Sequence, residues 1–354
     1  LAGSQLTIGS DVTIDGGAGV TLDANQQSRV LLVQGGDTAA TLAHLTVTHG
    51  NVGFDNAGGG GVRAEAGTTL TLDRTTVVEN QGGTADGAGI YADTVHLIES
   101  VVADNSTGGF GRGGGIRAHA ATLTDSEVRD NGALYGGGVY ADTVILTGST
   151  INDNHAGSAF LGRGGGISAL SVTLTNSTIV HNEAGDTGGG ISAGSVTIAN
   201  STVSGNTATS PRFTYGSGGV YANELSVINS IIAGNTAPTE HPDLFGTVSS
   251  NGHNIFGSEI AGAATGDQQG VSANLLFTTG LADNGGPTQT LALRNALDNP
   301  ALGGADPIDA PLEDQRGETR PQPADTQPDI GAFELDQSAV PSVGSTFTVT
   351  TAAD

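Results

Sequence analysis

The sequence predicts an all-β fold, a right-handed parallel β-helix in which coils stack into a solenoid that ends in an irregular C-terminal capping segment. Glycine clusters followed by alternating apolar residues recur about every 25 residues between residues 58 and 237. One such repeat is too short to bury its apolar face alone, so successive repeats must stack. Aromatic residues make up only 4% of the chain, and tryptophan and methionine are absent. The interior must therefore be built from aliphatic side chains.

Each repeat closes on an asparagine, as in GGGISALSVTLTNSTIVHN (164–182) and GGGISAGSVTIANSTVSGN (188–206). Apolar residues stand three, eight and ten positions before each asparagine, and a serine or threonine stands five positions before it. Stacking in register turns the apolar positions into interior columns and the asparagines into a ladder of side-chain amides at one corner. The ladder residues are Asn80, Asn105, Asn131, Asn154, Asn182, Asn206 and Asn235.

The two ends of the chain depart from this repeat. Before residue 58 the pattern is looser, and segments such as DVTIDG and RVLLVQ indicate irregular first coils, so residues 1–237 are assigned to coils. Ten of the eleven prolines follow residue 237, and residues 238–340 are expected to form irregular final coils and a cap over the open end of the solenoid. Residues 341–354 are interpreted as the start of a following module or as a donated strand.

Composition limits the classes of partner. The formal net charge is −25, and all eleven basic residues are arginine. Such a surface repels nucleic acid and anionic membranes, so no nucleic-acid partner is expected. No stretch of 18 apolar residues occurs, so no membrane span is expected in this segment. The absence of cysteine excludes a disulfide scaffold.

The C-terminal third carries a distinctive series of phrases: NSIIAGNTA (229–237), SSNGHNIFG (249–257), LADNGGPTQTLAL (281–293), DQRGETRP (314–321) and DIGAFEL (329–335). Together with the repeats, they resemble bacterial β-helix surface proteins of the choice-of-anchor Q type, within the pectate-lyase-like superfamily in its broad sense. The resemblance implies an extracellular or cell-surface module, often one part of a long chain. The final FTVTTAAD (347–354) resembles the opening strand of a CSLREA-type module.

Loops at the glycine-cluster corner are the first candidate binding face. All length variation between repeats falls there, and three of these loops place aromatic residues beside arginine. Such pairs can stack on sugar rings or contact a partner protein. The alternative is that the aromatic side chains fold back and seal the corner. The residues concerned are Phe110, Arg112, Phe160, Arg163, Arg212, Phe213 and Tyr215.

A second candidate site is the residue before each ladder asparagine. Asp104, Asp130 and Asp153 would stack about 4.8 Å apart, and Ca²⁺ could bridge such carboxylates. The alternative is a solvated acidic face. No other cofactor is required.

Two classes of function remain open. The first is a structural or adhesive module joined to copies of itself or to neighbouring modules, head-to-tail, with residues 346–351 pairing with the sheet edge near residues 5–14 of a neighbour. The alternative for this terminal strand is that it pairs on its own solenoid or is disordered. The second is a β-helix that binds or degrades extracellular polysaccharide. Lyase or galacturonase chemistry needs a strong base or clustered aspartates on one face. Because the sequence shows no such cluster, no catalytic residue is assigned.

Overall fold

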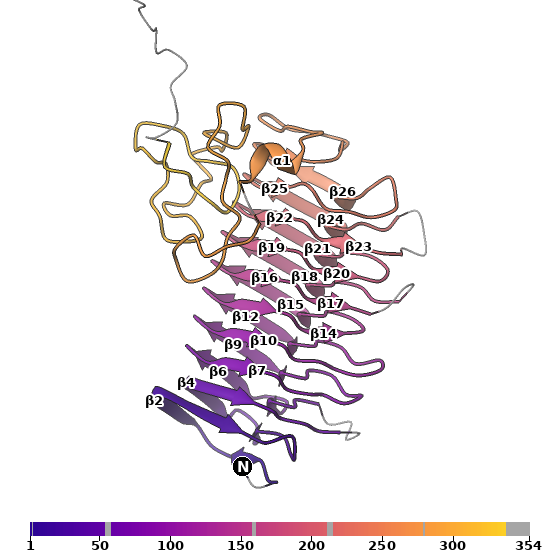
Figure 1. Ribbon diagram of the computed structural model, residues 1–354, viewed down its shortest axis with the longest axis vertical. Helices are drawn as coiled ribbons and strands as arrows, with labels where there is room; N and C mark the ends of the chain where they lie inside the picture. Colours follow the sequence, from indigo (N-terminus) through magenta and orange to yellow (C-terminus); the bar gives the residue numbers. More distant parts are fainter. Residues whose placement is uncertain (2, 54–57, 158–160, 211–214, 279, 338–354) are drawn as a thin grey trace, which may run out of the picture.

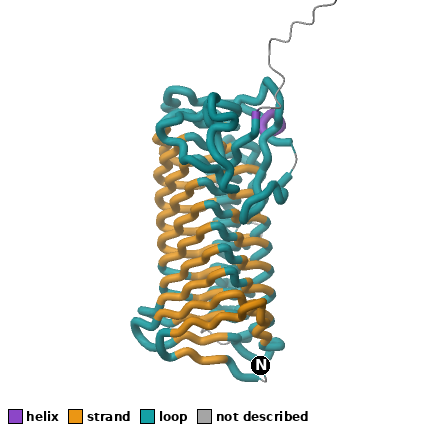
Figure 2. Tube along the Cα trace, turned by 90° about the vertical axis from the view of Figure 1, so that its left-hand side faces the viewer, coloured by secondary structure: helices purple, strands orange, loops and turns teal. Residues whose placement is uncertain are grey.

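The computed structural model describes residues 1–337, apart from residues 2, 54–57, 158–160, 211–214 and 279. Its strands stack into an elongated solenoid with the N-terminal coil at one end (Figure 1, Figure 2). Strands of neighbouring coils pair in parallel, as residues 167–175 do with residues 191–199. Within the described residues, the one α-helix is the four-residue α1 (Ala273–Leu276). The predicted all-β solenoid is confirmed.

Three lines of strands run the length of the molecule and form one continuous sheet. What we call the long sheet contains β2 (Val12–Asp23), β4 (Ala39–Thr48), β6 (Thr69–Asp73), β9 (Thr94–Ile98), β12 (Ala120–Thr124), β15 (Val139–Thr147), β18 (Ile167–Thr175), β21 (Ile191–Ala199), β24 (Val220–Ile228) and β26 (Leu244–Ser250). The second line contains β7 (Thr76–Val78), β10 (Val101–Ala103), β13 (Glu127–Arg129), β16 (Thr150–Asn152), β19 (Thr178–Val180), β22 (Thr202–Ser204), β25 (Ile231–Ile232) and β27 (Ile255–Phe256).

The third line occupies the N-terminal coils and then merges with the first part of β15. It contains β1 (Leu6–Ile8), β3 (Leu31–Val33), β5 (Val62–Ala64), β8 (Ile90–Tyr91) and β11 (Ile116–Arg117). A separate four-stranded sheet lies at the glycine-cluster corner and contains β14 (Gly132–Ala133), β17 (His155–Ala156), β20 (Glu183–Ala184) and β23 (Thr207–Ala208).

The predicted interior columns are confirmed. Strand register aligns like residue with like, as with Val172, Val196 and Leu225 on consecutive coils. Burying an aliphatic side chain of this size contributes about 1.5–3 kcal/mol, and each coil adds several. The column that follows the glycine clusters is completely buried and comprises Val62, Ile90, Ile116, Val139, Ile167, Ile191 and Val220.

The predicted asparagine ladder is also confirmed, and its members are at most 4% exposed. At each step the backbone N–H and the side-chain amide of one asparagine donate to Oδ1 of the next, as from Asn154 to Asn182 at 3.0 and 2.9 Å. The ladder continues past Asn235 to Asp243, whose Oδ1 accepts both bonds at 2.9 and 3.1 Å. Burial raises the pKa of Asp243. The sequence pattern did not indicate this terminal carboxylate.

The glycine clusters belong to the same structural unit as the ladder. A β carbon on Gly190 would lie 2.9 Å from the carbonyl oxygen of Gly219 and 3.1 Å from the amide group of Asn206. Gly188 adopts a φ of +63°, in the left-handed region that favours glycine. Glycine clusters and asparagines therefore recur together because the amides pack on backbone that has no room for side chains.

The last part of the chain was expected to cover the end of the solenoid, but most of it turns back along the side (Figure 1). We call residues 284–335 the C-terminal strap. Three asparagines on consecutive coils hold its backbone: Asn229 donates to the Asp306 carbonyl at 3.0 Å, Asn200 to Asp309 at 3.1 Å, and Asn176 to Glu313 at 2.8 Å. The strap lies along the side because these corner amides present donors to it.

Gln315 fixes the strap to the second line of strands. Its Nε2 donates to Thr150 Oγ1 at 2.7 Å, and its Oε1 accepts from Thr178 Oγ1 at 2.6 Å. All three residues are buried. The phrase DQRGETRP therefore contributes a side-chain contact that joins the strap to the solenoid wall.

A buried ionic network holds the strap to itself. Arg320 and Glu334 are fully buried and 3.4 Å apart, and Asp329 accepts backbone hydrogen bonds from Gly303 and Leu335 at 2.7 and 2.8 Å. Burial, with the nearby negative charge of Glu334, raises the pKa of Asp329 to about 7.

Raising the pH from 5 to 8 is therefore expected to lower the melting temperature by several degrees. An unfolded aspartate titrates near 3.8, so between about pH 4 and 7 the folded state holds a proton that the unfolded state has released. This stabilisation is complete below pH 4 and is lost as pH rises through about 7. Asp329→Asn should lose most of the dependence, whereas Asp298→Asn, on the exposed surface, should keep it. Equal pH dependence in both variants would contradict the assignment.

Candidate functional site

A column of outward-facing arginine and aromatic residues runs along one face of the solenoid. Each member directly follows the buried residue that begins its strand, so strand alternation turns its side chain outward. Consecutive members lie about 4.8 Å apart. We call this set the arginine–tyrosine column, and its members in order are Arg63, Tyr91, Arg117, Tyr140, Ser168, Ser192, Tyr221 and Phe245.

Neighbouring members of the column contact one another. The guanidinium carbon of Arg63 lies 5.0 Å from the ring centre of Tyr91, and that of Arg117 lies 5.0 Å from Tyr140. These distances are typical of cation–π interactions. At the other end, Tyr221 and Phe245 stack with ring centres 5.4 Å apart and planes 12° apart.

The two serines interrupt the column between Tyr140 and Tyr221, which are separated by three coil steps, or about 14 Å. A hollow of about 500 Å³ lies over Ser168 beside Tyr140, and a second space of about 50 Å³, which shares Arg163 and Asp186 with it, is lined by Tyr215 and Tyr221. The short side chain of Ser168 therefore leaves room for a site with Tyr140 on one side. The hollow is lined by Arg112, Tyr135, Tyr140, Leu161, Gly162, Arg163, Ser168 and Asp186.

The glycine-cluster loops build one wall of the hollow. Single parallel bridges align Arg112, Tyr135, Arg163 and Thr187 on consecutive coils. Arg163 Nε donates to the buried Asp186 carboxylate at 3.2 Å, and the Arg112 guanidinium lies 5.3 Å from the ring centre of Tyr140. Two cationic groups thus project into one hollow on a chain with a net charge of −25.

The seven residues predicted as a binding face divide into three groups. Arg112 and Arg163 line the hollow, and Tyr215 lines the smaller neighbouring space, with its ring centre 5.5 Å from that of Phe245. Phe110 is 78% exposed and does not line the hollow, so the alternative that the aromatic residues seal the corner does not apply to it. The remaining predicted residues lie outside the described residues: Phe160, Arg212 and Phe213.

The arginine–tyrosine column was not predicted from the sequence. Tyr91, Tyr140 and Tyr221 each follow the apolar residue after a glycine cluster, in the phrases GIY, GVY and GVY. This constant position was a usable signal, because a residue next to an inward-facing strand residue must face outward. The loop aromatics drew the prediction instead, since only they stand beside arginine in the sequence.

The hollow is suited to binding a ring-shaped polar ligand. Aromatic faces can stack on sugar rings, serine hydroxyls can donate or accept hydrogen bonds, and guanidinium groups can pair with a ligand carboxylate. Among the residues that line it, Asp186 is the one carboxylate. Glycoside hydrolysis commonly uses a pair of carboxyl groups across the scissile bond.

The predicted metal residues Asp104, Asp130 and Asp153 occupy one position on consecutive coils, all exposed and with φ near +55°. Burial, and next the charge of Asp130, raise the pKa of Asp104. The Arg129 guanidinium stands between two of them, 2.8 Å from Asp130 and 3.8 Å from Asp104. Over the described residues, no three His, Asp or Glu side chains converge on a possible metal position. Binding of Ca²⁺ here would require Arg129 to move away.

The sequence left two alternatives for this column, bridging by Ca²⁺ and a solvated acidic face. If Ca²⁺ bridges the column, chelation with EDTA at low salt should lower the melting temperature by a few degrees, because the bound ion stabilises only the folded state. Asp130→Asn should remove most of this dependence. An unchanged melting temperature after chelation would leave Arg129 as the counter-ion of the column.

No helix in the described part of the chain has the length and apolar character needed to cross a bilayer.

Comparison with known proteins identifies the family. Neither the curated proteins nor the solved structures contain a match to this sequence. The family model described as the right-handed β-helix region matches residues 60–237, which is half of the chain and covers every regular coil described above. The chain therefore belongs to the right-handed β-helix family.

Proposed function

We propose that this chain is an adhesive module of the bacterial cell surface that binds extracellular polysaccharide in the hollow of the arginine–tyrosine column. One observation supports the proposal most: where the column is interrupted by serine, the space over Ser168 is lined by the ring of Tyr140 and by Arg112 and Arg163. A rigid stack of coils holds these groups in fixed positions, which lowers the entropic cost of binding.

The extracellular location is inferred from the resemblance of the C-terminal phrases to the choice-of-anchor Q type. The acidic surface agrees with it, since a net charge of −25 keeps a long solenoid soluble and apart from anionic lipids. The two arginines favour a polysaccharide that carries acidic groups, because guanidinium–carboxylate pairs bring charge-assisted hydrogen bonds.

Binding can be tested on an array of neutral and acidic oligosaccharides, followed by calorimetry with the best ligand. We expect Tyr140→Ala and Arg163→Ala each to weaken binding about tenfold or more, which corresponds to about 1.4 kcal/mol. Tyr91→Ala is the matched control, because Tyr91 belongs to the same column but lies outside the hollow. Binding that survives both hollow variants, or the absence of any ligand on the array, would refute the proposal.

We further propose that modules join head-to-tail. The strand β2 pairs with β4 along one edge, and no other described strand pairs with it. Leu6, Val12 and Val20 near this edge are 39–47% exposed. An open edge of this kind accepts a strand from another molecule, and pairing with residues 346–351 of a neighbour would propagate as a filament.

A further inference from the structure

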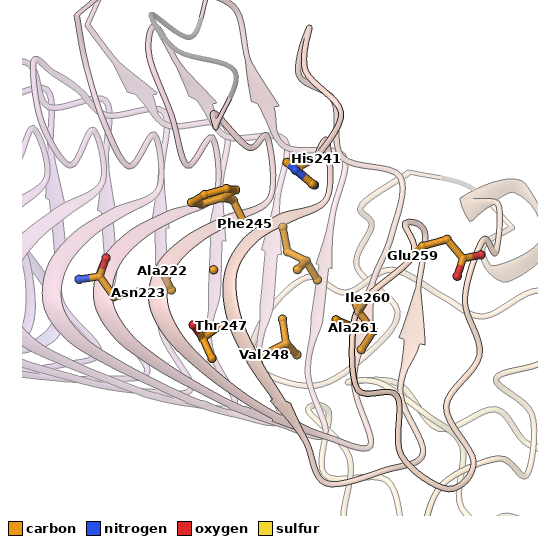
Figure 3. Close-up of a pocket in the computed structure, with 11 residues that line it drawn as sticks. Ala222, Asn223, His241, Phe245, Thr247, Val248, Glu259, Ile260 and Ala261 are labelled. Carbon is orange, nitrogen blue, oxygen red and sulfur yellow. The ribbon is translucent and has the colours of Figure 1, made fainter.

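A cavity of about 610 Å³ lies beside the last strand of the long sheet (Figure 3). Leu244, Phe245 and Val248 of β26 form one side, and Ile260 and Ala261 form the other. Figure 3 shows His241 and Glu259 beside the opening, at the margin of this space. Val248 and Ile260 also pack against the interior core, so the cavity opens directly onto the end of the solenoid interior.

The cavity stands where the next strand of the long sheet would be. From β4 to β24 each long-sheet strand has a parallel partner on both sides, whereas β26 pairs only with β24 within the described residues. After β27 the chain crosses the end without adding a strand to this sheet. The outer N–H and C=O groups of β26 therefore border a cavity with a mostly apolar lining, and such an edge is a template for strand addition.

We propose that residues 346–350 of the same chain occupy this cavity as one further parallel strand of the long sheet. Their sequence, TFTVT, repeats the alternation of hydroxyl and apolar residues seen in TLTLD (69–73) and SVTLT (171–175). In the matching register, Phe347 would continue the interior column that ends in Leu225 and Val248. Thr348 would continue the outer column that ends in Ser226 and Ser249.

The position of Gln337 favours the same chain as the source of this strand. Gln337 donates a hydrogen bond to Asp329 at 2.7 Å, and Asp329 also accepts one from the backbone N–H of Gly303. The carbonyl of the next residue, Gly304, lies 2.8 Å from the imidazole of His253 on the last coil. The eight residues that follow Gln337 can span about 26–29 Å. The seven-residue strand β26 is about 23 Å long, so the extended link is longer than the strand itself. The outer edge of the added strand would then face β2 of a neighbouring copy.

The chain has no cysteine, which makes an engineered disulfide a direct test. In the proposed register the Cα atoms of residues 249 and 348 would lie about 4.8 Å apart, within the range that a disulfide bridges. Mild oxidation of Ser249→Cys/Thr348→Cys should give an intramolecular disulfide, seen as a monomer that migrates faster on non-reducing gels. The control, Thr71→Cys/Thr348→Cys, uses the same outer column where both neighbours are already paired. It should cross-link at least tenfold more slowly.

Three results would overturn the proposal: disulfide-linked dimers in place of monomers, cross-linking no faster than in the control, or cross-linking unchanged by adding Phe347→Asp.

A second measurement needs no cysteine. Deleting residues 344–354 should speed hydrogen exchange of the β26 amides at least tenfold while leaving β21 unchanged. Equal exchange in the intact and shortened chains would also overturn it.

Discussion

Replacing Ile167 with aspartate is expected to unfold the solenoid. Ile167 is fully buried, between Val139 on one coil and Ile191 on the next. The substitution loses about 1.5–3 kcal/mol of apolar burial and adds several kcal/mol for an unpaired carboxylate in a dry interior. Together these approach the whole stability of a typical folded chain, about 5–15 kcal/mol.

Arg163→Ala is the matched control, four residues earlier in the same coil. Its side chain is half-exposed and pairs with the Asp186 carboxylate, so the loss of stability should be a small part of that expected at Ile167. Thermal denaturation followed by circular dichroism compares the two variants. Equal midpoints would contradict the assignment of residue 167 to the interior and of residue 163 to the loop wall.

Replacing Asn154 with alanine is expected to cost about 2–6 kcal/mol. The backbone N–H and side-chain amide of Asn131 both donate to Asn154 Oδ1 at 3.0 Å, and both would lose their acceptor inside the protein. A buried donor without a partner costs about 1–3 kcal/mol. The carbonyls of Val128 and Asn152 would also lose the donor that they share. The loss falls in the middle of the ladder, where the neighbouring Asn131 and Asn182 are buried.

Asp153→Asn provides the comparison for this variant. Asp153 is exposed and adopts a φ of +54°, which asparagine tolerates. Its effect on the free energy of unfolding should therefore stay within about 0.5 kcal/mol. Chemical denaturation measures both values, and a loss at residue 154 no larger than that at residue 153 would contradict the ladder's contribution to stability.

The fold could be predicted because its interactions repeat. The residues of one column, such as Val172, Val196 and Leu225, stand at a fixed distance before an asparagine in the sequence. Seven repeats show the same spacing, so the column can be recognised without the structure. The ladder's last member, Asp243, could not be found in this way. It follows Asn235 by only eight residues and belongs to an irregular coil, so its position depends on tertiary structure.

The candidate site was only partly predictable. Arg112 and Arg163 were identified from their loops, but the hollow that they face exists because the column has the short side chain of Ser168 where other coils carry tyrosine or arginine. Small residues in a strand give no local signal of a cavity.

The path of the C-terminal strap could not be predicted for a related reason. Its contacts, such as Gln315 with Thr150, join residues 165 positions apart and follow no repeat.

A crystal structure with the oligosaccharide that binds most tightly would test the central claim most directly. We expect a sugar ring against Tyr140 and over Ser168, with its polar groups within hydrogen-bond distance of Arg112 or Arg163. A ligand bound elsewhere on the solenoid, with the hollow empty, would contradict it.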